Sequence, residues 1–381
     1  MRSAETVLGV IQERGKRGLP VEDLYRQLFN RELYLRAYGR LYRRHGALTR
    51  GATPETVDGM SLEKIDALIE AVRQERHRWT PVRWVEIPKS NGKPRPLGIP
   101  TWSDKLLQEV MRSLLDAYFE PQFSPQSHGF RQARGCHTAL QQIDQVWLGT
   151  AWFIEGDIAR CFDSLDHEVL LAMLGENIHD CRFLRLIANL LKAGYLDNWR
   201  FNATLSGTPQ GGVLSPLLSN VYLDRLDKFI EAELLPRYNR GARRKTNSEY
   251  NKVGHRANYM AHAGRHKAAL TLRRQAQVMP SVVLVDPDYR RLRYVRYADD
   301  YLLGFTGPRA EAEEIKVRIG QFLHDTLKLE LSEAKTLITH ARTEAAHFLG
   351  YEVTVLQHNA KRDRSGVAAS MGRLPSKCPW M

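Results

Sequence analysis

Two short apolar runs flank a pair of acids late in the chain. Tyr294-Val295 precedes the segment Tyr297-Ala298-Asp299-Asp300, and the apolar run 301–305 follows it. Apolar runs separated by a short polar link predict two strands joined by a tight turn. Adjacent carboxylates repel each other unless a cation or a proton lies between them. The turn is therefore a candidate site for a hard cation such as Mg²⁺, although Asp is also common in solvated turns.

A second apolar run also ends in acids, upstream of the first. Residues 151–154 predict a buried strand that leads into Glu155, Asp157 and Ile158. If Asp157 lies beside the Asp299-Asp300 turn, three carboxylates converge, as two Mg²⁺ ions about 4 Å apart require for phosphoryl transfer. The alternative for Asp157 is an ordinary acid that caps a loop at the end of a strand.

Helical periodicity predicts helices around these strands. The Gly-rich segment 207–212 leads into a helical pattern with Ser215 as the expected N-cap and Pro216 as the first helical residue. The stretch 310–328 repeats apolar residues on one face, and a similar stripe follows Ser61. The pattern therefore predicts a chain that mixes helices and strands.

The order of the motifs along the chain resembles a group II intron reverse transcriptase. The segments that carry the resemblance are 89–100, 127–131 (SHGFR), 157–162, 208–220, 297–300, 329–336 (LELSEAKT) and 348–351 (FLGY). Seven collinear motifs over roughly residues 20 to 355 are far more specific than any one of them. The resemblance implies an α+β right-hand polymerase fold with fingers and palm, in which an antiparallel palm sheet is backed by helices.

The resemblance also implies roles for individual residues. Asp157, Asp299 and Asp300 would be the catalytic, metal-binding acids, and the main-chain carbonyl of Ile158 would also face a metal. The expected cofactor is two Mg²⁺ ions, with Mn²⁺ as the alternative. Phe162 matches the bulky family position that rejects a ribose 2′-OH, so the expected substrates are deoxynucleoside triphosphates (dNTPs).

Further positions would contact the substrate. Lys89 and Arg95 match basic positions that meet the incoming triphosphate, and a guanidinium suits that anion because its donors form a fixed fork. A solvated basic hairpin with a turn at Asn91-Gly92 would explain both residues equally well. Gln210 and Gly211 would line the nascent base pair.

Two basic residues keep two interpretations each. Arg131 either contacts the triphosphate or braces the fingers. Lys335 lies where the family places a lysine near the pyrophosphate, which would allow a role as general acid. An exposed lysine in a loop between a helix and a strand is the equally ordinary interpretation of Lys335.

Composition agrees with a nucleic-acid enzyme without requiring one. The chain has 56 Lys and Arg against 43 Asp and Glu, a net charge of +13 and a pI near 9.6. Such an excess favours polyanion binding, but it also fits a ribosome-associated or membrane-surface protein. No apolar run is long enough to span a membrane, so we expect a cytoplasmic protein. Four scattered cysteines indicate neither a zinc site nor disulfides.

The sequence divides into four parts. Residues 1–80 form a basic, largely helical extension, and residues 81–234 with 289–355 form fingers and palm. The basic insertion 235–288 interleaves tyrosines with cations, which suits RNA, although a solvated insertion would look the same. The resemblance implies intron RNA as its partner, as in the mitochondrial-like lineage. Residues 356–381 look like a disordered or degenerate tail, so we expect the thumb and maturase domain to be missing.

The sequence therefore predicts an RNA-directed DNA polymerase that uses an RNA template, a DNA primer and dNTPs. Two alternatives of another kind are a non-catalytic RNA-binding splicing factor and an inert truncated copy. A retron or diversity-generating polymerase would share the chemistry, but the long basic insertion and the 207–220 segment favour the intron type. The sequence leaves the oligomeric state open.

Overall fold

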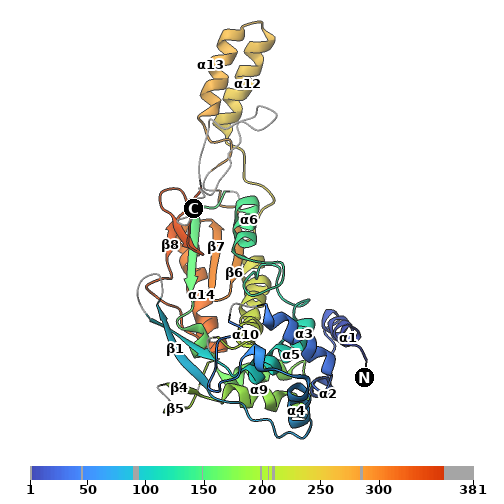
Figure 1. Cartoon of the computed structure of the whole chain (residues 1–381). Helices are drawn as coiled ribbons and strands as arrows, with labels where there is room; N and C mark the ends of the chain where they lie inside the picture. The colour runs from blue at the N-terminus through green and yellow to red at the C-terminus, as the bar shows by residue number, and fades with distance from the viewer. Residues whose placement is uncertain are drawn as a thin grey trace.

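The computed structural model describes residues 2–43, 46–88, 94–147, 149–197, 200–204, 206–207, 211–283 and 286–355, with only the backbone of residues 94–96. Lys89, Gln210 and the tail 356–381 lie outside these residues, and for Arg95 only the backbone is described. Within the described part the fold is α+β, as predicted, with two four-stranded sheets and a small hairpin (Figure 1).

The palm sheet has the strand order β6-β7-β3-β8, and every neighbouring pair is antiparallel. Its strands are β3 (Trp152–Asp157), β6 (Arg291–Tyr297), β7 (Asp300–Thr306) and β8 (Ile338–His340). The strands predicted around the two acidic segments are therefore confirmed.

Side chains alternate across this sheet, so each face builds its own core. Phe153, Val295 and Leu302 pack with helix α6 (Cys136–Val146) and with the hairpin of β9 (Ala346–Phe348) and β10 (Tyr351–Val353). Ile154 and Leu303 belong to the larger core on the other face. Because both faces are buried, the strands are nearly continuous apolar runs rather than alternating ones.

Two long helices cover that other face. They are α10 (Ser215–Phe229) and α14 (Arg309–Leu327), whose Phe229 and Phe322 rings stack at 4.2 Å between centroids. The predicted helix over 310–328 is confirmed. The predicted N-cap is wrong by one residue, because Ser215 is the first helical residue and Leu214 is the cap. The side chain of Gln108 accepts the N–H groups of Val213 and Leu214 instead.

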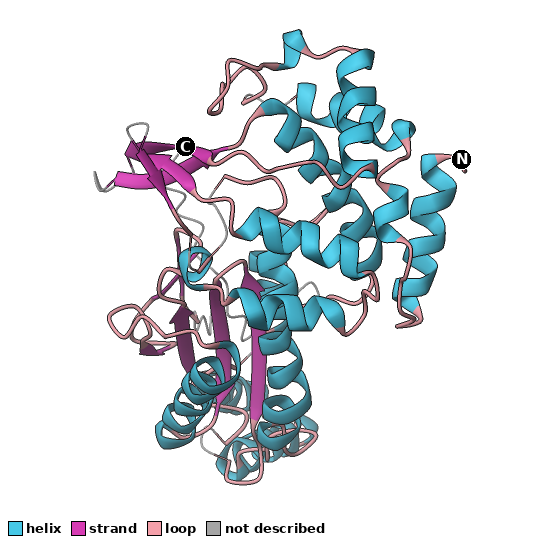
Figure 2. Ribbon diagram, turned by 90° about the horizontal axis from the view of Figure 1, so that it is seen from below, coloured by secondary structure: helices cyan, strands magenta, loops and turns pink. Residues whose placement is uncertain are grey.

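The fingers sheet lies apart from the palm sheet (Figure 2). Its order is β2-β1-β4-β5, and its strands are β1 (Val82–Pro88), β2 (Pro94–Ile99), β4 (Tyr195–Asp197) and β5 (Arg200–Asn202). β1 and β2 form an antiparallel hairpin, whereas β1 and β4 run parallel.

Helices of the amino-terminal part share a core with the long helix α5 (Trp102–Phe119), and the first and third of them pack on it directly. They are α1 (Ala4–Lys16), α2 (Leu24–Gln27), α3 (Arg31–Tyr42) and α4 (Leu62–Arg73), with a 3₁₀ turn η1 at Val57–Gly59. Ser61 caps α4 by accepting the N–H of Lys64, which confirms the predicted helix start. Shorter helices link fingers and palm: α7 (Cys161–Ser164), α8 (His167–Gly175) and α9 (Cys181–Leu191).

The basic insertion forms a helical hairpin that projects from the palm (Figure 1). Before it, α10 continues through the π-helical turn η2 (Ile230–Leu234) into α11 (Leu235–Tyr238), and Tyr238 packs on Phe305 of β7. The hairpin itself is α12 (Ser248–His262) and α13 (His266–Gln277), which pack mainly on each other. Of all the helices described here, none combines the length and the apolarity needed to cross a membrane.

Candidate active site

Asp157 and Asp300 are direct cross-strand partners. Asp157 ends β3, Asp300 begins β7, and the two residues lie opposite each other in the antiparallel register. Directly opposed residues place their side chains on the same face of a sheet. The predicted convergence of the two acidic segments is therefore present in the structure for this pair.

Asp299 occupies the tight turn that precedes Asp300. Tyr297 pairs with Asp300, so the link between β6 and β7 is the two-residue loop Ala298-Asp299. Ala298 has a positive φ of 56°, the conformation that two-residue hairpin turns require at their first position. The turn thus brings a third acid to the end of the strand pair.

The three acids create an excess of negative charge at one point. Burial, together with the charges of Asp299 and Asp157, raises the pKa of Asp300 to about 7. A carboxyl group in this position is stabilised by a proton or by a nearby cation.

Lys335 supplies one such cation, since its Nζ donates to Oδ2 of Asp157 at 3.0 Å. This hydrogen bond is the leading cause of the raised pKa of Lys335. Among the residues whose placement is described, no group of three or more His, Cys, Asp or Glu side chains is arranged to hold a metal ion. The donors themselves suit Mg²⁺, because carboxylate oxygens are the hard ligands it prefers.

The backbone pairing at Ile158 sets the direction of its main-chain carbonyl. Hydrogen bonds of 2.9 Å run from Ser332 N–H to the Asp157 carbonyl and from Ala159 N–H to the Glu330 carbonyl, so Ile158 and Leu331 form a non-hydrogen-bonded pair. In such a pair each residue's own N–H and C=O point away from the partner strand. The Ile158 carbonyl is therefore directed toward the side on which β7 and its acids lie.

Phe162 lies in the short helix α7, five residues after Asp157, and its ring is the first in a row of three aromatic rings. The centroid of Phe162 is 6.1 Å from that of Phe130, and Phe130 is 6.4 Å from Tyr297. Tyr297 immediately precedes the acidic turn. Phe162, the residue predicted to reject a ribose 2′-OH, thus belongs to a row of three aromatic rings beside the acids.

Gly211 packs against the fingers sheet. A Cβ at this position would lie 2.6 Å from the Gly98 carbonyl oxygen and 2.8 Å from a methyl carbon of Leu97, and its φ is +103°. Only glycine combines this backbone conformation with such close contact. Gly211 therefore lies directly against strand β2, and its role at the nascent base pair stays a prediction.

Arg131 is buried, and protein groups occupy its guanidinium. It donates to both carboxylate oxygens of Glu120 and to the carbonyls of Ser124 and Ser127, with distances of 2.6–3.1 Å. Its guanidinium also lies over the ring of Phe123 at 5.4 Å. These contacts favour the bracing role over the triphosphate contact.

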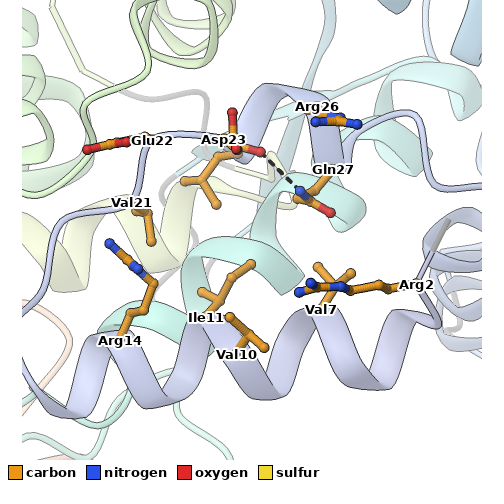
Figure 3. A pocket seen from close by; sticks show the side chains of 11 residues that line it. Arg2, Val7, Val10, Ile11, Arg14, Val21, Glu22, Asp23, Arg26 and Gln27 are labelled. Atoms are coloured by element: carbon orange, nitrogen blue, oxygen red, sulfur yellow. Dashed lines mark hydrogen bonds between the residues drawn. The ribbon is translucent and has the colours of Figure 1, made fainter.

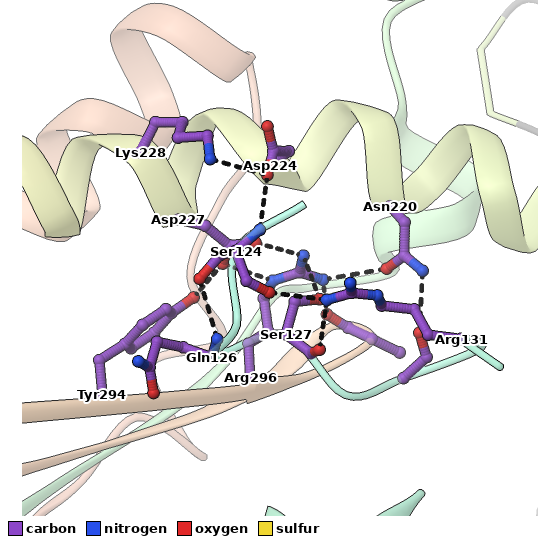
Figure 4. A network of polar contacts seen from close by, with 12 residues as sticks. Ser124, Gln126, Ser127, Arg131, Asn220, Asp224, Asp227, Lys228, Tyr294 and Arg296 are labelled. Atoms are coloured by element: carbon purple, nitrogen blue, oxygen red, sulfur yellow. Dashed lines mark hydrogen bonds and ion pairs between the residues drawn. The ribbon is translucent and has the colours of Figure 1, made fainter. Parts of the chain in front are cut away.

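Sequence reasoning missed a buried network behind the acidic turn (Figure 4). Arg296 of β6 and Asp227 of α10 form a fully buried ion pair at 2.6 Å, and Tyr294 donates to the same carboxylate. Arg296 also donates to the Ala298 carbonyl at 2.8 Å and to Ser127 Oγ at 2.9 Å. An arginine inside an apolar strand requires a buried partner, and this feature of the sequence could have indicated the network.

A glycine completes this support for the turn. A Cβ on Gly129 would lie 2.3 Å from the backbone nitrogen of Ala298, so the two backbones are in direct contact. The amide of Asn220 donates to the Gly129 carbonyl at 2.8 Å. Arg296 and Gly129 therefore hold the acidic turn from two sides.

A basic hairpin and an amino-terminal pocket lie away from the acids. On the α12–α13 hairpin, Glu249 is the sole acid among residues 248–277, which include the exposed cations Arg256, Arg265, Lys267, Arg273 and Arg274. At the amino terminus, a pocket of about 460 Å³ between α1 and α2 is lined by apolar residues that include Val7 and Ile11, by arginines, and by the acids Glu22 and Asp23 (Figure 3). Of the predicted site residues whose side chains the structure describes, none lines this pocket.

Comparison with known proteins agrees with the geometry. A family model described as reverse transcriptase (RNA-dependent DNA polymerase) matches residues 87–353. The group II intron-encoded protein LtrA of Lactococcus lactis subsp. cremoris is 40% identical over 362 residues, covering 93% of this chain and 59% of LtrA. The putative COX1/OXI3 intron 1 protein of Saccharomyces cerevisiae is 36% identical, covering 86% of this chain and 39% of its own length.

A third relative, protein YkfC of Escherichia coli, is 34% identical over 86% of this chain and 82% of its own length. The chain thus spans about three fifths of LtrA and most of YkfC. The resemblance inferred from the seven motifs is confirmed. The chain belongs to the reverse transcriptase family, and the proteins to which it is similar include those encoded by group II introns.

Proposed function

We propose that this chain is an RNA-directed DNA polymerase of the group II intron type, which adds dNTPs to a DNA primer on an RNA template. The observation that carries the proposal is the pairing of Asp157 with Asp300, with Asp299 in the adjoining turn. These acids lie inside the segment that matches the reverse transcriptase family.

The three acids and the Ile158 carbonyl would hold Mg²⁺. When bound, the metal would activate the primer 3′ oxygen and stabilise charge on the triphosphate. The protein itself contributes positioning, because β3 and β7 fix Asp157 and Asp300 in register. The raised pKa of Asp300 supports this assignment, since a group of like charges is a natural site for a cation.

Other residues would select and hold the substrate. Phe162 would exclude the ribose 2′-OH, and Gly211 with Gln210 would line the nascent base pair. Lys89 and Arg95 would meet the triphosphate, and Lys335 would lie near the pyrophosphate. Arg131 would act at a distance, by fixing the loop that faces the acidic turn.

RNA would also contact surfaces outside the site. The projecting α12–α13 hairpin combines exposed cations with the exposed ring of Tyr259, and aromatic rings among cations suit single-stranded RNA. We assign this hairpin to intron RNA. The same surface supports the second candidate function, a non-catalytic RNA-binding splicing factor, and either protein would act in the cytoplasm.

Primer extension on an RNA template tests the proposal. The assay compares the parent chain with Asp299→Ala/Asp300→Ala in Mg²⁺ and dNTPs at low salt, where electrostatic binding is strongest. Glu313→Gln, an exposed acid on α14, is the matched control. We expect extension by the parent and the control but not by the double variant.

A parallel RNA-binding measurement separates the two functions. If none of the proteins extends the primer while all fold and bind RNA equally, the polymerase proposal is wrong and the splicing-factor function takes its place. A parent that neither extends nor binds RNA contradicts both.

A further inference from the structure

Phe130 combines two unusual properties for an aromatic residue. Its side chain is 53% exposed, and its backbone lies in the left-handed region with φ of 57°. Residues other than glycine, asparagine and aspartate rarely adopt this conformation, which costs of order 1 kcal/mol or more. Such a residue persists only when the surrounding structure fixes it.

The neighbours of Phe130 on both sides are fixed. On one side, His128 donates its N–H to the Arg296 carbonyl at 2.8 Å, and Gly129 is held by Asn220 and by its contact with Ala298. On the other side, Arg131 is tied to Glu120 and to two carbonyls of its own loop (Figure 4). The loop therefore holds the Phe130 ring outward, next to the acidic turn.

The ring of Phe130 contacts the two aromatic residues that border the acids. It meets Phe162 in an edge-to-face arrangement, with an interplanar angle of 76°. It also lies beside Tyr297, with an interplanar angle of 40°. Phe130 thus lies between Phe162, the residue predicted to reject a ribose 2′-OH (the sugar gate), and Tyr297, which precedes the acidic turn.

Phe162 itself is carried by a short helix. Phe162 belongs to α7, which is only four residues long and follows Arg160 in a left-handed conformation. A four-residue helix fixes a side chain poorly by itself, because its backbone hydrogen bonds are few. Contact with a clamped aromatic ring supplies the missing constraint.

We propose that Phe130 is a specificity-determining residue, which holds the Phe162 ring in the position where it excludes a ribose 2′-OH. This inference rests on the proposed polymerase function and deepens it. Removal of the Phe130 ring lets Phe162 turn away, so ribonucleotides enter more readily while the acids remain in place. Phe130 acts through Phe162 and is a positioning residue rather than a catalytic one.

The test measures kcat/KM for a dNTP and for the matching ribonucleotide opposite the same template base. Phe130→Asn removes the ring but keeps a residue that tolerates the left-handed backbone. Phe130→Tyr keeps the ring and serves as the rescue variant. Phe201→Ala, an exposed aromatic residue on β5 in the fingers, is the matched control. Thermal unfolding of each variant confirms that it is folded.

We expect the preference for dNTPs to fall about three- to tenfold in Phe130→Asn, the range that the loss of one aromatic pair gives. Phe130→Tyr and Phe201→Ala should keep the preference of the parent. Phe162→Ala should lose more of it, and Phe130→Asn/Phe162→Ala should lose no more than Phe162→Ala alone, because both changes act on one ring.

Four results would overturn the inference, in three distinguishable ways. Unchanged preference in Phe130→Asn, or effects of the two changes that add, would overturn the role of Phe130 while leaving the polymerase intact. Unchanged preference in Phe162→Ala would overturn the gate itself, and the support by Phe130 with it. A parent that extends no primer would overturn the proposed function and therefore also this inference.

Discussion

Lys335 and Asp157 form an ion pair at the mouth of the acidic cluster, with Nζ 3.0 Å from Oδ2. The lysine is otherwise exposed, with 68% of its side chain accessible. In the proposed metal site the same carboxylate would hold Mg²⁺. Lysine and metal are expected to compete for this carboxylate.

Replacing Lys335 by methionine should strengthen Mg²⁺ binding severalfold, because the carboxylate loses its competing cation. Calorimetric titration of the free protein with Mg²⁺ at low salt measures the effect. Lys328→Met is the matched control, because Lys328 pairs in the same way with Asp166, at 2.9 Å. Affinity that stays unchanged or falls in Lys335→Met contradicts the competition.

Replacing Arg296 by glutamine should destabilise the fold by about 3–5 kcal/mol, because Asp227 is left as a buried charge without its partner. Urea unfolding measures the difference. Arg309→Gln removes an exposed pair with Glu313 and should cost less than about 1 kcal/mol. Equal losses of stability in the two variants would show that the buried ion pair contributes no more than the exposed one.

Gly129→Ala should abolish or strongly reduce primer extension, because its Cβ would lie 2.3 Å from the backbone of the acidic turn. Gly39→Ala in helix α3 is the control, since no atom lies within 4 Å of its added Cβ. That change should raise stability by about 0.5–1 kcal/mol, because alanine favours a helix more than glycine does. Full extension by folded Gly129→Ala contradicts the close contact.

Asp224→Asn should change how stability depends on pH. Burial and the charge of Asp227 raise the pKa of Asp224 from 3.8 to about 6. The folded state therefore keeps a proton that the unfolded state loses, and the contribution of Asp224 to stability falls as pH rises from about 4 through 6. Above pH 6 the ionised carboxylate in its buried site is a cost that asparagine lacks.

The free energy of unfolding of Asp224→Asn, relative to the parent, should thus rise by about 1–3 kcal/mol between pH 4.5 and pH 7.5. Urea unfolding at the two pH values measures it. Glu5→Gln, an exposed acid on α1, should show no such rise. A relative stability of Asp224→Asn that is flat or falls with pH would falsify the assignment.

Charge reversal on the projecting hairpin should weaken RNA binding without stopping synthesis. Arg273→Glu/Arg274→Glu removes two exposed cations, so affinity should fall and the salt dependence of binding should become less steep. Filter binding over a range of salt concentrations measures both, and extension of a short template should be unchanged. If affinity and salt dependence are unaltered, the hairpin is a solvated surface that does not bind RNA.

The strands and the acidic pair could be predicted because local patterns specify them. Apolar runs that end in acids gave β3 and the β6–β7 hairpin, and the antiparallel pairing then placed Asp157 opposite Asp300. The start of the helix after Ser61 could also be predicted from local sequence, because Ser61 caps its own helix.

Features that depend on distant segments could not be predicted in this way. The start of α10 differed by one residue because Gln108 of α5 binds the backbone ahead of the helix. The bracing by Arg131 depends on carbonyls whose directions are set by folding. The left-handed backbone of Phe130 follows from contacts with β6 and α10, which the motif SHGFR does not contain.

The position of β3 within its sheet has a consequence for biosynthesis. β3 lies between β7 and β8, and both of these partners follow it in the chain. A ribosome therefore releases β3 with two unpaired edges and two apolar faces, long before either neighbour emerges. Exposed edges of this kind invite association with other chains. The nascent protein should therefore depend on chaperones until both β7 and β8 have emerged, and the acidic pair can form once β7 is in place.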